Sequence, residues 1–137
     1  MTGGLETYRA VSFSTMDRGQ QLLAIYEGGI GFLKQAVTAH ERHDLERFSY
    51  FLRRGQDVIS ELMSSLDPKP APQLAGRLER LYEFMLFQLS EANLTRKAGP
   101  LRQVTPLLAR VYDAYRQVIL NPTPEVRAIL ATPPHIR

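Results

Sequence analysis

Cysteine is absent from the 137 residues of this chain. Without thiols, disulfides and thiolate metal sites are excluded. Long hydrophobic runs are also absent, because no stretch approaches the roughly 20 apolar residues that a membrane-spanning helix needs. The first ten residues contain no apolar run typical of a signal peptide. We therefore expect a cytoplasmic protein that does not insert into membranes.

Charge of one sign is not concentrated anywhere along the chain. The net charge is only +3, and acidic and basic residues alternate, as in Glu79-Arg80. Proteins that bind nucleic acids usually carry a clustered basic patch, so we expect no nucleic-acid partner. Hydrophobic residues make up 44% of the sequence, which fits a single domain over residues 1–137 with a substantial core.

The alternating pattern of β-strands is missing, and apolar residues recur instead with the 3.6-residue period of amphipathic helices. This period predicts four helices, at about residues 18–43, 45–66, 73–97 and 101–120. Each helix has a stripe of residues that should face the core. In the first helix the stripe is Leu22, Tyr26, Ile30, Leu33, Val37 and His40, and in the second it is Phe48, Leu52, Gly55, Ile59, Leu62 and Leu66. In the third helix it is Leu74, Leu78, Leu81, Tyr82, Met85, Leu89 and Ala92, and in the fourth it is Val104, Leu108, Val111, Tyr112, Tyr115 and Ile119.

Local signals place the helix ends. Asp17 and Asp44 are candidate N-caps, and Pro72 suits the first turn of the third helix. Gly99-Pro100 predicts the end of the third helix. Pro106 predicts that the fourth helix either begins nearer residue 105 or is kinked at its start.

Short connections between four such helices predict an all-α fold, an antiparallel up-down four-helix bundle over about residues 17–120. A short N-terminal segment, 1–16, and a proline-rich C-terminal tail, 121–137, lie outside it. Each is either a frayed terminus or an apolar cover for exposed bundle surface; the sequence does not decide between them.

Some apolar residues lie off the core stripes. Phe84, Phe87 and Leu94 fall 120° to 180° from Leu78 on a helical wheel, on the face expected to meet water. Contiguous apolar strips often mark interaction sites, so we expect a partner, a tail or a second copy to cover them. The candidate partner-binding groove comprises Tyr8, Phe13, Ile25, Phe32, Phe84, Phe87, Leu94, Leu107 and Val118.

Three glycines, Gly28, Gly29 and Gly31, fall inside the first helix. Each costs roughly 1 kcal/mol relative to alanine. The cost indicates close approach of another backbone, either a neighbouring helix or a bound peptide.

Nothing in the sequence predicts catalysis. A carboxylate-bridged metal pair in a bundle needs Glu-x-x-His motifs, and none of the three histidines, His40, His43 and His135, belongs to one. The glycine cluster does not lie between a strand and a helix, so it is no phosphate loop. We expect that the protein is not an enzyme and that it binds no metal and no cofactor.

Several collinear segments carry a family resemblance. They are Tyr8, the segment Tyr26–Leu33, the block Ile59–Asp67, and the segments Leu81–Met85 and Leu89–Asn93. In this combination the chain resembles the flagellar secretion chaperone family FliS from about Tyr8 to about Ile119. Three features depart from the family pattern. Asp17-Arg18-Gly19 stands where Ser-Pro is usual, Phe87 stands where polar or basic residues are common, and the tail after Asn121 is longer than in many members.

The resemblance implies a cytoplasmic chaperone with a four-helix bundle. Such a chaperone binds the C-terminal segment of flagellin, prevents premature polymerisation and assists delivery to the flagellar type III export gate. It also implies that the N-terminal segment, with Tyr8 and Phe13, lies over part of the groove when no client is bound.

Two other functions remain open from the sequence. One is a structural or regulatory bundle that self-associates through its apolar strips, which would make the protein a homo-oligomer in the absence of a client. The other, weaker, is a ferritin-like metalloenzyme.

Overall fold

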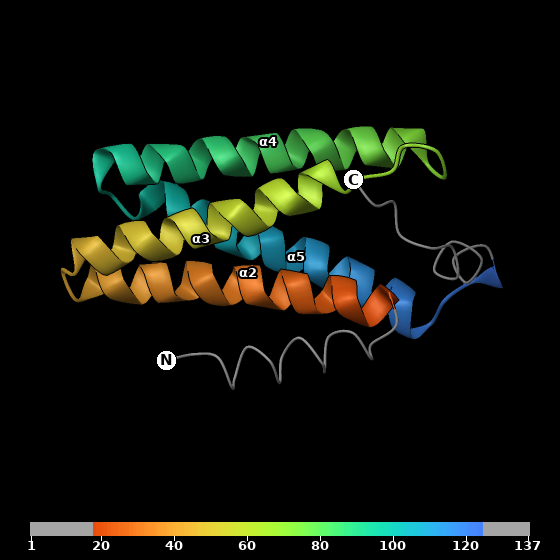
Figure 1. Ribbon diagram of the computed structural model, residues 1–137, viewed down its shortest axis with the longest axis horizontal. Helices are drawn as coiled ribbons and strands as arrows, with labels where there is room; N and C mark the ends of the chain where they lie inside the picture. Colours follow the sequence, from red (N-terminus) through yellow and green to blue (C-terminus); the bar gives the residue numbers. More distant parts are fainter. Residues whose placement is uncertain (1–17, 125–137) are drawn as a thin grey trace, which may run out of the picture.

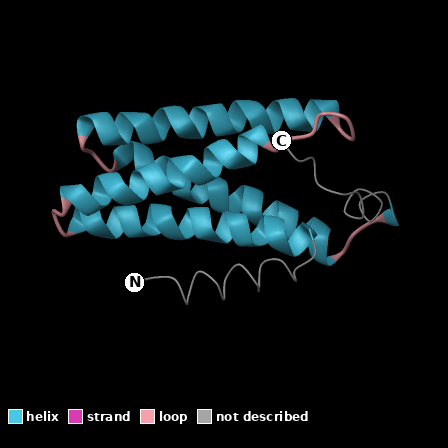
Figure 2. Ribbon diagram, in the orientation of Figure 1, coloured by secondary structure: helices cyan, strands magenta, loops and turns pink. Residues whose placement is uncertain are grey.

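The computed structural model describes residues 18–124, and these residues form four helices (Figure 1). They are α2 (Arg18–Glu41), α3 (Leu45–Ser64), α4 (Pro72–Thr95) and α5 (Gly99–Leu120). Successive helices run in opposite directions, and no strand occurs in this part of the chain (Figure 2). The predicted all-α up-down bundle is confirmed. The segments predicted to flank it, 1–16 and most of 121–137, lie outside the described residues, as does the candidate cap Asp17.

Each helix packs against two others. α3 lies against α2 and α4, and α5 lies against the same two helices from the other side. The members of each remaining pair, α2 with α4 and α3 with α5, are therefore diagonal across the bundle. This order decides which face of each helix is buried.

Most of the core is built from the predicted apolar stripes. Fully buried side chains come from all four helices: Tyr26, Leu33, Phe48, Leu52, Ile59, Tyr82, Met85, Leu89, Leu101, Val104 and Leu108. Two fully buried residues, Ala36 of α2 and Leu101 of α5, did not belong to the predicted stripes. The prediction that Leu74 faces the core is wrong, because 53% of its surface is exposed. It lies in the first turn of α4, which extends beyond the end of α3 in Figure 1.

Two helix starts follow the sequence signals. The side chain of Asp44 accepts a hydrogen bond from the backbone N–H of Arg47 at 3.1 Å, which caps α3. Pro72 is the first residue of α4, where its missing N–H costs no hydrogen bond.

The prediction that Gly99-Pro100 ends the third helix is wrong. These residues do not end α4; they open α5, with Pro100 in its first turn. α4 ends earlier, at Thr95, and the left-handed φ of 60° at the next residue, Arg96, turns the chain without a glycine. Pro106 then lies inside α5 rather than at a start near residue 105. Because proline has no N–H, the carbonyl of Arg102 lacks its usual helical donor.

Close packing explains one of the three glycines in α2. A Cβ on Gly29 would lie 2.8 Å from Cγ1 of Val58 in α3, whereas nothing lies within 4 Å of a Cβ on Gly28 or Gly31. On the α3 side of the interface, a Cβ on Gly55 would lie 2.5 Å from Cδ2 of Leu33. A glycine on each helix therefore lets α2 and α3 approach closely.

A cluster of tyrosines crosses the centre of the bundle. The hydroxyls of Tyr26 on α2 and Tyr82 on α4 hydrogen-bond to each other, and the ring of Tyr115 on α5 lies 5.5 Å from that of Tyr26. Burial raises the pKa of both Tyr26 and Tyr82 above the ordinary value of 10.0, because a phenolate loses its hydration there. The pair thus joins the diagonal helices α2 and α4 by neutral groups.

Candidate binding surface on α4

The outer face of α4 carries three large apolar side chains that solvent reaches. Phe84 is 42% exposed, Phe87 60% and Leu94 80%. We call these three residues the α4 strip. Because α4 buries Tyr82, Met85, Leu89 and Ala92 against its neighbours, the strip lies on the opposite side of the helix, as predicted. Apolar side chains gathered on one outward face are typical of a surface that binds another polypeptide.

A polar contact between α3 and α4 adjoins the strip. The hydroxyl of Ser49 donates to Oδ1 of Asn93 at 2.8 Å, and Nε2 of Gln56 donates to Oγ of Ser90 at 3.2 Å. We call these four residues the polar seam. Hydrogen bonds across the seam join α4 to α3 without involving the aromatic side chains of the strip, which stay exposed.

Charged residues of both signs flank the strip. Arg80 and Glu83 are exposed on α4 within one turn of Phe84, and Glu91 is half-buried between Phe87 and Leu94. With both signs present, the surface has no strong local field. Apolar contact, rather than charge, is therefore the main recognition chemistry that it offers.

The other predicted groove residues lie on different helices. Ile25 and Leu107 are partly buried and pack against the core. Phe32 is half-buried and stacks on Phe51 of α3, with ring centroids 6.4 Å apart. Val118 is exposed on α5, and Tyr8 lies, like Phe13, outside the described residues. The structure thus brings Phe84, Phe87 and Leu94 together on one helix, and binding at any of these positions stays a prediction.

Four exposed apolar residues were not among the candidates: Leu45, Tyr50, Leu74 and Leu120. Leu74 continues the core stripe of its helix, so periodicity could not have identified it. Leu45 is the first residue of α3, and Leu120 is the last residue of α5. Tyr50 does lie off the core stripe of α3, and that position was a usable signal.

No metal chemistry is organised in the described residues, where no group of three His, Cys, Asp or Glu side chains could hold an ion. His40 instead packs its ring edge-on against Phe48, at 4.9 Å, and its Nε2 lies 3.0 Å from the carbonyl oxygen of Arg96. It links the C-terminal ends of α2 and α4. Of the helices described, none is long and apolar enough to cross a bilayer.

The described residues thus define a four-helix bundle with apolar side chains that its own core does not bury. Comparison with known families makes the assignment specific. The profile of the family described as "Flagellar protein FliS" matches residues 1–122, and the chain belongs to this family of flagellar secretion chaperones.

Individual relatives agree with the family match. The flagellar secretion chaperone FliS of Bacillus subtilis is 30% identical over 112 residues, covering 82% of this chain and 83% of its own length. FliSB of Pseudomonas aeruginosa is 34% identical over 91 residues, 66% of this chain and 72% of its own. FliS of Salmonella typhimurium is 25% identical over 120 residues, 84% of this chain and 89% of its own. The predicted family resemblance is confirmed.

Proposed function

We propose that this chain is a cytoplasmic chaperone for flagellar export that binds the C-terminal segment of a flagellin. It keeps the flagellin from polymerising early and assists its delivery to the flagellar type III export gate. The observation that supports this proposal is the α4 strip in a member of the FliS family. A chaperone of this kind needs an apolar surface that its own core does not use.

The spacing of the strip suits a helical client. Phe84, Phe87 and Leu94 are separated by three and seven residues, so they form a ridge along one side of α4. A client helix with apolar residues at the same spacing can pack along this ridge as an amphipathic helix packs into a groove. Burying a fully exposed phenylalanine is worth roughly 1.5–3 kcal/mol, so the exposed parts of the two rings contribute part of the contact energy of a complex.

Release at the export gate is compatible with such a surface. A segment that is disordered when free must become ordered on binding, which typically costs about 2–5 kcal/mol of the contact energy. The net affinity is therefore smaller than the buried area indicates. The client can leave without the whole bundle having to unfold.

A synthetic peptide from a flagellin C-terminus tests the proposal. Mixed with the full chain, it is expected to gain helicity by circular dichroism and to form a stoichiometric complex by calorimetry. Phe87→Asp should weaken binding about tenfold or more, because a carboxylate then has to be desolvated against the client. Gln103→Asp, which adds the same charge at an exposed position of α5, is the matched control and should bind normally.

Absence of any complex at micromolar concentration would refute the proposal. An equal loss of binding in Phe87→Asp and Gln103→Asp would mean that the α4 strip is not the binding site, because the added charge rather than its position would then explain the loss. Thermal melts of both variants show whether each is folded before binding is compared.

Self-association through the α4 strip is the second candidate, since two exposed phenylalanines on one helix can also pack against a second copy. In that case sedimentation velocity should show a concentration-dependent dimer that Phe87→Asp abolishes and that the flagellin peptide does not dissociate. Dissociation of such a dimer by the peptide would instead indicate a homo-oligomer that exists only without client.

A further inference from the structure

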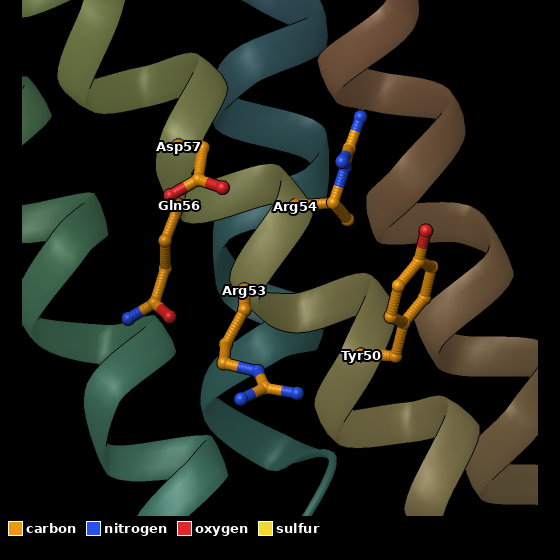
Figure 3. A pocket seen from close by; sticks show the side chains of 5 residues that line it. All are labelled: Tyr50, Arg53, Arg54, Gln56 and Asp57. Atoms are coloured by element: carbon orange, nitrogen blue, oxygen red, sulfur yellow. The ribbon is translucent and has the colours of Figure 1, made fainter.

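A second surface, built from α2 and α3, differs in chemistry from the α4 strip. Two shallow hollows lie on it. One is lined by Tyr50, Arg53, Arg54, Gln56 and Asp57 of α3 (Figure 3). The other lies at the contact between α2 and α3, and its lining includes Lys34, Arg42, Arg47 and Phe51. We call the five cations of these linings, Lys34, Arg42, Arg47, Arg53 and Arg54, the basic face.

Most of this positive charge is not neutralised within the bundle. The described residues contain two ion pairs, Arg47 with Asp44 at 3.6 Å and Arg102 with Glu41 at 3.3 Å. The other four cations of the basic face therefore have no described carboxylate within ion-pair distance. Arg47 itself keeps 75% of its side chain exposed. Against five cations, the two linings hold a single carboxylate, that of Asp57.

Aromatic rings connect the two hollows. Tyr50 in one lining and Phe51 in the other make an edge-to-face contact, with centroids 5.2 Å apart. Phe51 stacks in turn on Phe32, and the guanidinium of Arg54 lies 5.2 Å from the centroid of that ring. In Figure 3 both Tyr50 and Arg54 lie on the α2 side of α3. Such a cation–π contact fixes the position of Arg54, so less entropy is lost when a ligand binds it.

We propose that the basic face binds an acidic peptide segment of a second protein. Carboxylates of that segment pair with the guanidinium groups, which form bidentate hydrogen bonds to planar acids. An apolar side chain of the segment packs on Tyr50, 48% of which is exposed, and on the neighbouring Phe51. This role goes beyond client binding, because it uses a different surface and a different chemistry.

The carboxylate of Asp57 favours a peptide over a uniform polyanion. A phosphate backbone or an anionic bilayer presents negative charge at every position and would place some of it against Asp57. A peptide can instead align a neutral or basic residue there while its acids meet the arginines. Selection of this kind is typical of charge complementarity between proteins.

The test uses a short fluorescein-labelled peptide in which Glu and Ser alternate around one central Trp, and a twin in which Gln replaces each Glu. Fluorescence anisotropy with the full chain should show binding of the acidic peptide, weakened by added salt, and none of the neutral twin. Reversing two charges in Arg42→Glu/Arg54→Glu should weaken binding about tenfold or more. The matched control is Arg110→Glu/Arg116→Glu on α5, the helix diagonal to α3, and it should bind as the unmodified chain does.

Four results would overturn the proposal. They are no binding of the acidic peptide, equal loss in the two double variants, tighter binding to phosphatidylglycerol vesicles, and tighter binding to single-stranded oligothymidine. Thermal melts of both double variants are recorded first. If Arg42→Glu/Arg54→Glu does not fold, the milder Arg42→Gln/Arg54→Gln with its α5 counterpart Arg110→Gln/Arg116→Gln replaces it and is read by the same criteria.

Discussion

The interface of α3 with α2 differs from its interface with α4. Toward α2, glycines at 29 and 55 let the helices approach until Val58 and Leu33 fill the space between them. Toward α4, two side-chain hydrogen bonds form the polar seam, and Phe84 and Phe87 of α4 face outward. Between α2 and α3, apolar side chains fill the contact. On α4, part of the apolar surface stays exposed.

The largest difference in the free energy of unfolding is expected between a leucine-to-alanine substitution at the α2–α3 contact and one on the outer face of α4. Leu33 is fully buried between α2 and α3, so Leu33→Ala is expected to cost about 2–5 kcal/mol, from lost burial and a cavity. Leu94→Ala, on the outer face of α4, should lower the free energy of unfolding by about 0.5 kcal/mol or less. Urea unfolding of both variants measures the free energy of unfolding. Similar losses would mean that the α4 strip is as well packed as the core.

A smaller but sharper effect is expected at the glycines of α2. Gly29→Val places a Cβ 2.8 Å from Cγ1 of Val58. Such overpacking typically costs about 1–3 kcal/mol. Gly28→Val is the matched control, because nothing lies within 4 Å of its Cβ, and it should change stability by about 0.5 kcal/mol or less. The same urea titration applies to both, and a neutral Gly29→Val would contradict the close approach of α2 and α3.

The tyrosine pair that joins α2 to α4 allows a test by substitution. Tyr82→Phe removes the hydroxyl partner of Tyr26 and should cost about 1 kcal/mol, because a buried hydroxyl loses a hydrogen bond. The double variant Tyr26→Phe/Tyr82→Phe should cost less than the sum of the two single changes, because both single changes break the same hydrogen bond. Strict additivity in thermal melts would show that the two hydroxyls do not interact.

The same pair predicts a loss of stability at alkaline pH. Because burial raises the pKa of both hydroxyls above 10.0 in the folded protein, ionisation occurs first in the unfolded chain and favours it. The stabilisation is fully present below pH 10 and falls as the pH rises above it, by up to about 1.4 kcal/mol per pH unit for each group. Urea unfolding from pH 8 to pH 11 should show a steeper fall for the unmodified chain than for Tyr26→Phe/Tyr82→Phe. Equal slopes would contradict the raised pKa values.

Sequence periodicity predicted the helices and most of the core because burial imposes the 3.6-residue spacing directly on the chain. It could not predict where α4 ends and α5 begins. Gly and Pro serve both to stop one helix and to start the next, and the left-handed turn at Arg96 has no sequence signal. The prediction failed at Leu74 for a related reason: the residue lies on the core stripe, but in the first turn of α4, which extends beyond the end of α3 (Figure 1).

The candidate site was partly predictable for the same physical reasons. Phe84, Phe87 and Leu94 were identified as outward-facing because they lie opposite the core stripe of their own helix. Where the remaining candidates lie depends on which helix is next to which, and a wheel for one helix does not contain this information. Phe32, for example, contacts Phe51 and Arg54 of α3 rather than any residue of the α4 strip.

The smallest predicted effect concerns the polar seam itself. Asn93→Ala removes the acceptor of the part-buried Ser49 hydroxyl and should cost about 1 kcal/mol. Gln56→Ala removes a bond that is exposed to water and should cost about 0.5 kcal/mol or less, because solvent replaces the lost partner. If the seam serves to hold α4 while its apolar residues face outward, Asn93→Ala should also increase amide hydrogen exchange in α4 more than in α2. Uniform exchange across both helices would mean that α4 is fixed by its core side chains alone, and that the seam has no separate role in presenting the α4 strip.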